Sequence, residues 1–127
     1  MMNNDFTNSN WYKTHTQPKI PIGYWRTIRF DVFNKLPWPQ IAKKTLSQTK
    51  TIEQAKLVLE KYGWKEHYFG QSHCRLCNKV ANGNGEYLIS YQGTTWVIPT
   101  GYFHYLETHN VKIDDMLVEI TNYYMSL

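Results

Sequence analysis

The chain has 127 residues, of which 42% are apolar and 16% aromatic, and its formal net charge is +4. This length suits one compact domain, and the apolar content excludes disorder through low hydrophobicity except at the ends. No apolar run reaches the roughly 20 residues of a membrane span, and the first residues lack the pattern of a signal peptide. We therefore expect a cytoplasmic protein with reduced cysteines.

Basic residues are concentrated in the first part of the chain. Residues 1–70 contain eleven Lys and Arg against five Asp and Glu, whereas residues 71–127 contain three against five. Such an excess permits weak contact with nucleic acid, although a solvated basic face is its commoner meaning.

The first half of the chain predicts one clear helix. Residues 1–12 resemble a flexible arm, and we expect residues 13–127 to form a single domain. Alternating apolar residues favour a strand within Tyr24–Val32, although Trp25, Ile28 and Val32 would also suit a helix. Pro39 could open a short helix that runs through Leu46.

The clear helix follows that segment. Thr51 and Gln54 have the spacing of a capping box, which places the start of the helix at Thr51. Ala55, Val58, Leu59 and Tyr62 form its apolar stripe, and Gly63 is expected in a left-handed C-terminal cap.

The second half predicts a hairpin followed by two helices. Short strands are expected at residues 86–91 and 94–98, joined by a Gln-Gly turn. The next helix should stop at Asn110, which tolerates the left-handed conformation. The last helix is expected from Asp114 or Asp115 to about Met125, with carboxylates in its first turn.

Two motifs predict one metal site. The only cysteines, Cys74 and Cys77, form a C-x2-C pair, and His104 and His109 follow with four residues between them. Two thiolates and two imidazoles in this order are the ligand set of a structural zinc site. Four protein ligands leave no position for water, which argues against catalysis by the metal.

The spacing of the two histidines requires a distortion in the helix that carries them. Residues five apart differ by about 140° around an ideal helix, so the two imidazoles converge only if the last turn loosens near His109. The expected stop at Asn110 would provide such a loosened end.

Other interpretations stay open. His73 and His67 are rival ligands, and either could replace one of the two helix histidines. The cysteines could instead be small buried core residues, with His104 and His109 in solvent. The C-x2-C-N-K stretch also resembles the zinc half of HNH nucleases, which need a second ligand pair and a catalytic histidine.

The C-terminal half carries a further, ordered set of residues around the metal motifs. In chain order this set is Cys74-Arg75-Leu76-Cys77, Asn82-Gly83, Trp96, Pro99, Gly101, His104-Tyr105, His109 and Val111. It resembles a group of small zinc-binding proteins, mostly bacterial and uncharacterised. The resemblance implies Cys74, Cys77, His104 and His109 as ligands and brings no established activity.

Together these patterns predict an α+β single domain. Its C-terminal part would be a zinc knuckle, a β-hairpin and a helix, a ββα-like module over about residues 68–112, packed on an N-terminal helix. The predicted function is a non-enzymatic, zinc-stabilised interaction domain with a protein partner and no membrane contact. The alternative is a nucleic-acid-binding protein that uses the basic N-terminal half, and the third hypothesis is a small HNH-like nuclease.

Overall fold

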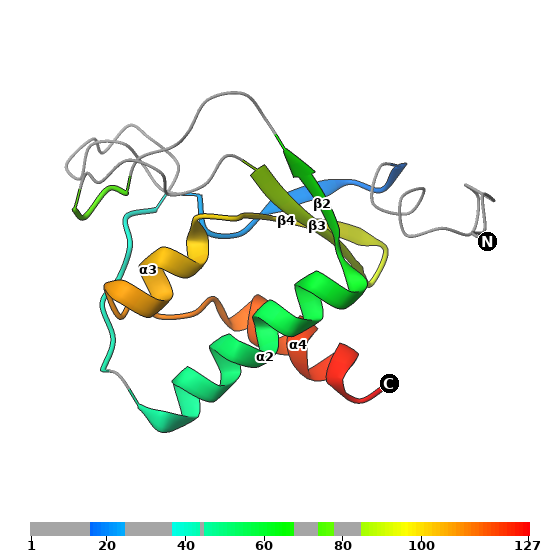
Figure 1. Ribbon diagram of the computed structural model, residues 1–127. Coiled ribbons are helices and arrows are strands. Elements are labelled where there is room, and N and C mark those ends of the chain that lie inside the picture. The colour runs from blue at the N-terminus through cyan, green and yellow to red at the C-terminus, as the bar shows by residue number, and fades with distance from the viewer. Residues whose placement is uncertain (1–15, 25–36, 44, 68–73, 78–84) are drawn as a thin grey trace.

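The computed structural model describes residues 16–24, 37–43, 45–67, 74–77 and 85–127. This part of the chain is a small α+β domain with three helices and a four-stranded mixed sheet (Figure 1). Its elements, in chain order, are β1 (Lys19–Pro21), α2 (Leu46–Tyr62), β2 (Trp64–His67), β3 (Gly85–Tyr91), β4 (Thr94–Pro99), α3 (Tyr102–Thr108) and α4 (Asp115–Met125).

The sheet has the strand order β1-β4-β3-β2. Strands β3 and β4 form the predicted hairpin, and both turn residues, Gln92 and Gly93, have positive φ values of 53° and 73°. Such a turn matches the twist of the strands that it joins. Strand β2 extends the hairpin antiparallel to β3, whereas β1 pairs with β4 in parallel.

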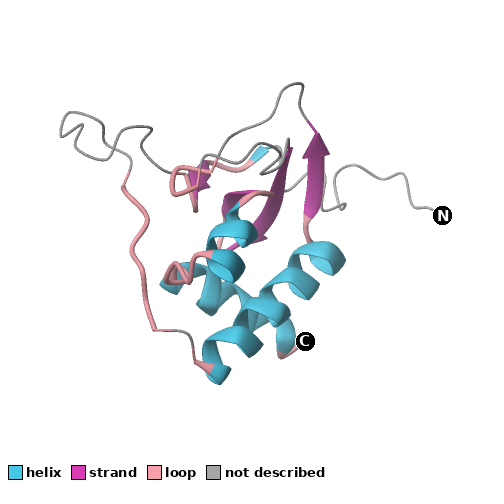
Figure 2. Cartoon of the chain, turned by 60° about the vertical axis from the view of Figure 1, so that its left-hand side comes forward, coloured by secondary structure: helices cyan, strands magenta, loops and turns pink. Residues whose placement is uncertain are grey.

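The helices pack against one face of this sheet, as Figures 1 and 2 show. Tyr87 and Ile89 of β3 and Ile98 of β4 point to that face and belong to the main hydrophobic core. The Tyr87 hydroxyl donates to Glu60 of α2 at 2.5 Å. Alternation along a strand then sends Glu86 and Leu88 to the opposite face of the sheet.

Helix α2 begins earlier than its capping-box pattern predicts. The N-cap is Thr45, whose hydroxyl accepts the Gln48 amide at 3.0 Å, and Thr51 lies inside the helix. The prediction of a start at Thr51 is therefore wrong, because a second threonine six residues upstream offers an equivalent cap. The predicted apolar stripe is confirmed, since Ala55, Val58 and Leu59 are buried and Tyr62 packs against the core.

The cap at the other end of α2 also differs from the prediction. Gly63 has φ −87° and ψ 173°, so it is extended rather than left-handed. The chain passes directly from the helix into β2, and a Cβ at this position would lie 2.6 Å from the Leu59 carbonyl oxygen. Glycine is thus required here for close approach of the backbone.

Thr45→Ala is expected to lower the free energy of unfolding by about 1 kcal/mol, because the Gln48 amide loses its acceptor. Thr51→Ala is the matched control, since the Thr51 hydroxyl only bonds back to the Ser47 carbonyl at 3.0 Å. It should change the free energy by less than about 0.5 kcal/mol. Urea unfolding followed by circular dichroism measures both values. A larger cost for Thr51→Ala would place the working cap at Thr51.

Several further predictions for the N-terminal half have other outcomes. The short helix predicted from Pro39 is wrong, because residues 37–43 contain no helix and instead lie beside residues 110–113. The arm at residues 1–12 falls outside the described residues, as does nearly all of the strand predicted within Tyr24–Val32. Strands β1 and β2 were not predicted from the sequence.

The two C-terminal helices confirm their predictions. The side chain of Asp114 accepts from the Met116 amide at 2.8 Å and caps α4. Helix α3 ends at Thr108, and Asn110 has the expected left-handed φ of 52°. None of the helices in the described part of the chain is long and apolar enough to cross a membrane.

Tyr102 at the start of α3 links three parts of the fold. Its side chain is 1% exposed, and its hydroxyl accepts the amide of Asp114, the cap of α4, at 2.9 Å. Its ring lies so close to Gly23 that a Cβ there would be 2.4 Å away, and Gly23 has a φ of 82°. One ring thus holds the end of the β1 segment, α3 and the start of α4 together.

Candidate metal centre

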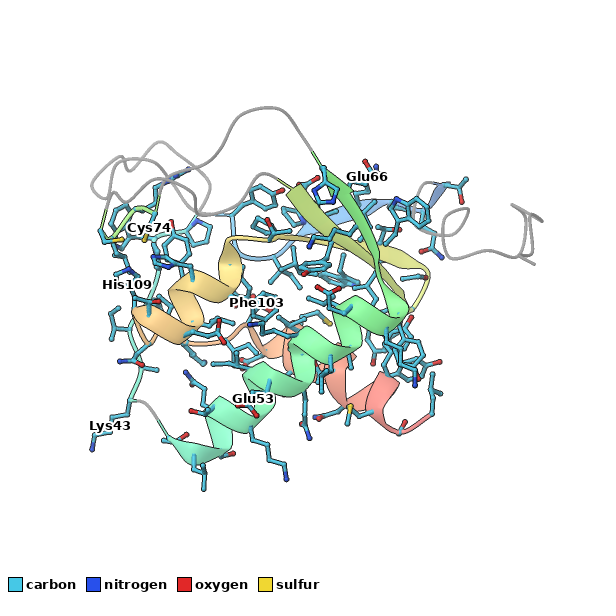
Figure 3. The ribbon with its side chains drawn as sticks, in the orientation of Figure 1. Lys43, Glu53, Glu66, Cys74, Phe103 and His109 are labelled. Atoms are coloured by element: carbon cyan, nitrogen blue, oxygen red, sulfur yellow. The ribbon has the colours of Figure 1, made fainter. Side chains whose placement is uncertain are left out.

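The structure brings the four sequence-predicted ligands together. One ligand atom from each of Cys74, Cys77, His104 and His109 can be chosen so that all four lie within 4.8 Å of one another. Figure 3 shows Cys74 and His109 close together at the end of α3. The four residues therefore form a Cys2His2 group that could hold a metal ion.

The cysteine side of this group is a tight turn over residues 74–77. The Leu76 amide donates to the Cys74 Sγ at 3.4 Å, the kind of bond that orients and stabilises a thiolate. Cys74 is fully buried and Cys77 is half-buried, and both are free thiols. Such a turn is needed for two thiolates two residues apart to point at one ion.

The histidine side depends on how α3 ends. His104 lies within the helix, and His109 is its C-cap residue with φ −110° and ψ 5°, values outside the helical range. The left-handed Asn110 then reverses the chain, and the Val111 amide donates to the Tyr105 carbonyl at 3.1 Å. The loosened end brings the two imidazole centroids to 4.9 Å, which confirms the requirement set by their spacing.

One pair of donor atoms has the separation expected around a tetrahedral ion. The Cys77 Sγ and the His104 Nε2 are 3.5 Å apart. Zinc bonded to sulfur and to nitrogen at its usual distances, in a tetrahedral arrangement, holds these two atoms about 3.6 Å apart. His109 Nε2 is buried and has no hydrogen-bond partner among the described residues. A buried polar atom without a partner is costly, and a bound ion would satisfy it.

Tyr105 supports the cysteine turn and was not predicted from the sequence. Its hydroxyl accepts the Arg75 amide at 2.7 Å across 30 residues of sequence, and its side chain is 4% exposed. Burial raises the pKa of Tyr105 to about 12, although the Arg75 amide opposes part of that change. The phenol therefore stays neutral at physiological pH and keeps its hydrogen. In the sequence it appeared only within the ordered set around the metal motifs, directly after His104, with no role assigned.

Backbone hydrogen bonds from residues 40–42 hold the segment that follows His109. The Ala42 amide donates to the Asn110 carbonyl and the Lys112 amide to the Gln40 carbonyl, both at 2.8 Å. Ile41 and Val111 form an antiparallel bridge between the same segments. Because Val111 is fully buried, this pairing satisfies the backbone groups around it and fixes the chain just after the metal ligand.

Of the two rival histidines, only His67 lies among the described residues. His67 is exposed at the end of β2, opposite Gly85, and does not belong to the group of four. His73 falls outside the described residues, so its candidacy stays a prediction. Glu107, three residues after His104, faces away from the centre and pairs with Lys56 at 3.3 Å.

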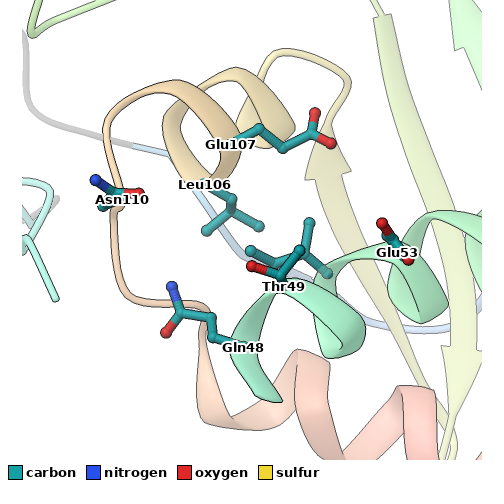
Figure 4. Close-up of a pocket in the computed structure, with 7 residues that line it drawn as sticks. Gln48, Thr49, Glu53, Leu106, Glu107 and Asn110 are labelled. Atoms are coloured by element: carbon teal, nitrogen blue, oxygen red, sulfur yellow. The ribbon is translucent and has the colours of Figure 1, made fainter. Parts of the chain in front are cut away.

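A small pocket lies on this other side of α3, against α2 (Figure 4). Its volume is about 150 Å³, and Leu106, Glu107 and Asn110 line it from one side, with Gln48 and Glu53 from the other. None of its lining residues is one of the four candidate ligands. The pocket and the metal group thus occupy different sides of the same helix.

His109→Ala is expected to reduce bound metal to a small fraction of one ion per chain, since it removes one of four donors. His67→Ala should leave the metal content unchanged, because the His67 side chain is exposed on β2. Elemental analysis of purified protein, with His73→Ala measured in parallel, decides the ligand set. Full metal in His109→Ala together with an empty site in His73→Ala would reverse the assignment.

Comparison with known proteins gave no relative. No family model matches the chain, and neither a curated protein nor a solved structure matches it significantly.

Proposed function

We propose that Cys74, Cys77, His104 and His109 bind one Zn²⁺ ion that stabilises the fold, and that the protein is a non-enzymatic interaction domain. The observation that carries this proposal is the closed donor set, in which four side chains converge. Mixed thiolate and imidazole donors favour zinc over magnesium or calcium, which prefer oxygen ligands.

A structural role follows from the number of donors. A catalytic zinc ion keeps one coordination position for water or substrate, whereas four protein ligands fill a tetrahedral ion. Two thiolates would also neutralise the charge of Zn²⁺, which weakens it as a Lewis acid. This reasoning argues against an HNH-like nuclease, which needs a second metal-ligating pair. The two free thiols are consistent with a reducing compartment such as the cytoplasm.

The local arrangement also supports the resemblance to small zinc-binding proteins. The cysteine turn, the hairpin β3–β4 and helix α3 follow one another in the order of a ββα-like zinc module. Helix α2 packs against this unit through Ile52 and Leu59, members of the same core as Leu106. Under this proposal the ion links the cysteine turn to helix α3 within the module. The remaining surface of the domain is then left for a partner.

Cobalt substitution tests the structural role. Co²⁺ at a closed site should give the absorption bands of a tetrahedral ion with two sulfur ligands, and added azide should leave these bands unchanged. An open site would take azide as a further ligand and its spectrum would shift. A spectrum that changes on azide titration would overturn the structural role and restore an enzymatic hypothesis.

The nature of the partner is tested separately. The alternative, nucleic-acid binding, draws on the basic excess in residues 1–70. We expect binding to a random oligonucleotide to vanish near physiological salt, because electrostatic binding falls steeply with ionic strength. A selected consensus sequence that binds at nanomolar affinity in that salt, and loses binding in Lys43→Ala, would replace the interaction-domain proposal by nucleic-acid recognition.

A further inference from the structure

Helix α2 carries a stripe of four residues on the side that faces away from the core. Leu46, Lys50, Glu53 and Leu57 follow one another at intervals of four, three and four residues. At about 100° per residue, these positions lie within about 60° of one another around the helix axis. The buried Ala55 lies on the opposite side of the helix. These four residues, called the α2 stripe below, therefore point away from the domain.

All four side chains of the α2 stripe are open to a partner. Leu46 is 87% exposed and Leu57 is 65% exposed. Lys50 and Glu53 are exposed as well, and neither forms an ion pair with another residue of the described part of the chain. Figure 1 shows α2 in front of α4, on the outer side of the helical layer.

The order of residues in the α2 stripe is complementary to its own reverse. When two copies of α2 lie antiparallel, Leu46 of one copy meets Leu57 of the other, and Lys50 meets Glu53. A two-fold axis through the middle of the stripe produces all four contacts at once, because such an interface uses the same surface on both copies. Parallel helices would instead place lysine against lysine and glutamate against glutamate, so the charges select the antiparallel arrangement.

The spacing of the α2 stripe also suits the packing of two helices. Alternating intervals of three and four residues are those of the a and d positions of a coiled coil. Reversing the direction of the helix leaves the intervals of four, three and four unchanged, so all four contacts stay in register. Side chains at this spacing fit between those of a facing helix at a crossing angle of about 20°.

We propose that the α2 stripe binds a second copy of this chain, so that two domains associate through antiparallel α2 helices. This inference goes beyond the proposed function and does not depend on zinc, because α2 carries none of the four candidate ligands. The occupant follows from complementarity. A stripe whose apolar ends and opposite charges pair with their own reverse is matched by the same stripe on another copy.

The size of the α2 stripe predicts a weak and reversible dimer. A helix of 17 residues is about 25 Å long, and a single pair of such helices buries less than the roughly 1,200 Å² of a standard interface. The two leucine contacts supply the apolar burial. The exposed Lys–Glu contacts add little affinity and act against other alignments. We therefore expect a monomer at low micromolar concentration and a substantial dimer fraction at about 1 mM.

Sedimentation velocity of the metal-loaded chain, from about 20 μM to about 1 mM, tests the proposal. The sedimentation coefficient of the wild-type protein should rise with concentration, and the α2 amide signals should shift in NMR spectra over the same range. Leu57→Gln should weaken the association at least about tenfold, because the two-fold symmetry removes a leucine from both ends of the interface. Glutamine is nearly as good a helix former as leucine, so the variant keeps its helix.

Charge reversal tests the antiparallel pairing. Lys50→Glu and Glu53→Lys should each weaken self-association at least about tenfold, because like charges then meet at two contacts. A mixture of these two variants should associate at least as well as the wild-type protein, since each chain supplies the charge that the other lacks. Lys112→Glu is the matched control, because it makes the same charge change on an exposed residue outside α2. It should leave the association unchanged.

The proposal fails if the wild-type protein sediments as a monomer at every concentration. It also fails if both charge reversals associate as strongly as the wild-type protein, or if their mixture associates no better than either alone. Elemental analysis of the same samples reports on zinc separately. A dimer without zinc would contradict the proposed metal site and support this inference, and a zinc-loaded monomer would do the reverse. The wild-type titration decides the question even if a variant folds poorly.

Discussion

Cys74→Ser is expected to empty the metal centre and to lower the free energy of unfolding by roughly 4 kcal/mol or more. The Cys74 side chain is completely buried, and its Sγ accepts the Leu76 amide within the turn. A serine hydroxyl is a poor zinc ligand, so the ion and its binding energy would be lost together. The hydrogen bond from the Arg75 amide to Tyr105 would remain as a link between the cysteine turn and α3.

Urea unfolding and elemental analysis measure this effect together. The wild-type protein in the presence of a chelator should behave like Cys74→Ser, because both lack the ion. Glu107→Gln is the matched control on α3, since its side chain is 46% exposed and pairs with Lys56 rather than with the metal group. If metal-loaded wild-type protein unfolds at the same urea concentration with and without chelator, the stabilising role of the ion is wrong.

Tyr102→Ala is the second change with a large expected effect. It should lower the free energy of unfolding by about 3 to 5 kcal/mol, the usual cost of removing a large buried aromatic side chain. Tyr102→Phe keeps the ring and removes the acceptor of the Asp114 amide. Its cost should be about 1 kcal/mol. The difference between the two variants separates packing from hydrogen bonding.

Thermal and urea unfolding of both variants give these free energies. Tyr123→Ala is a suitable control, since that tyrosine is on α4 and 47% exposed. It should cost clearly less than Tyr102→Ala. Equal costs for Tyr102→Ala and Tyr102→Phe would show that the hydroxyl, rather than the ring between Gly23 and the helices, carries the stabilisation.

The sequence predicted those parts of the fold whose signals are local. The hairpin around Gln92 and Gly93, the stop at Asn110 and the cap at Asp114 each depend on a few neighbouring residues. The start of α2 was placed wrongly because Thr45 and Thr51 carry the same capping chemistry. Strand β1 has only three residues and pairs in parallel with β4, far along the chain, so no local pattern marks it.

In the candidate site, too, residues with local signals could be predicted and contacts between distant residues could not. Spacing and chemistry were sufficient to select Cys74, Cys77, His104 and His109, because metal ligands must be of few residue types. Tyr105 could not be found in this way, since its hydrogen bond to Arg75 joins residues 30 positions apart and tyrosines are usually core residues.

The position of the hairpin between the two halves of the metal centre affects the cost of closing the site. Cys77 and His104 are 27 residues apart, and strands β3 and β4 make up half of the intervening chain. A flexible loop of that length loses entropy when its ends meet. A hairpin with a two-residue turn forms within microseconds and already brings its ends together. Formation of the hairpin therefore already accounts for much of the loop-closure entropy loss before an ion binds. The ion then cross-links a chain that is already ordered.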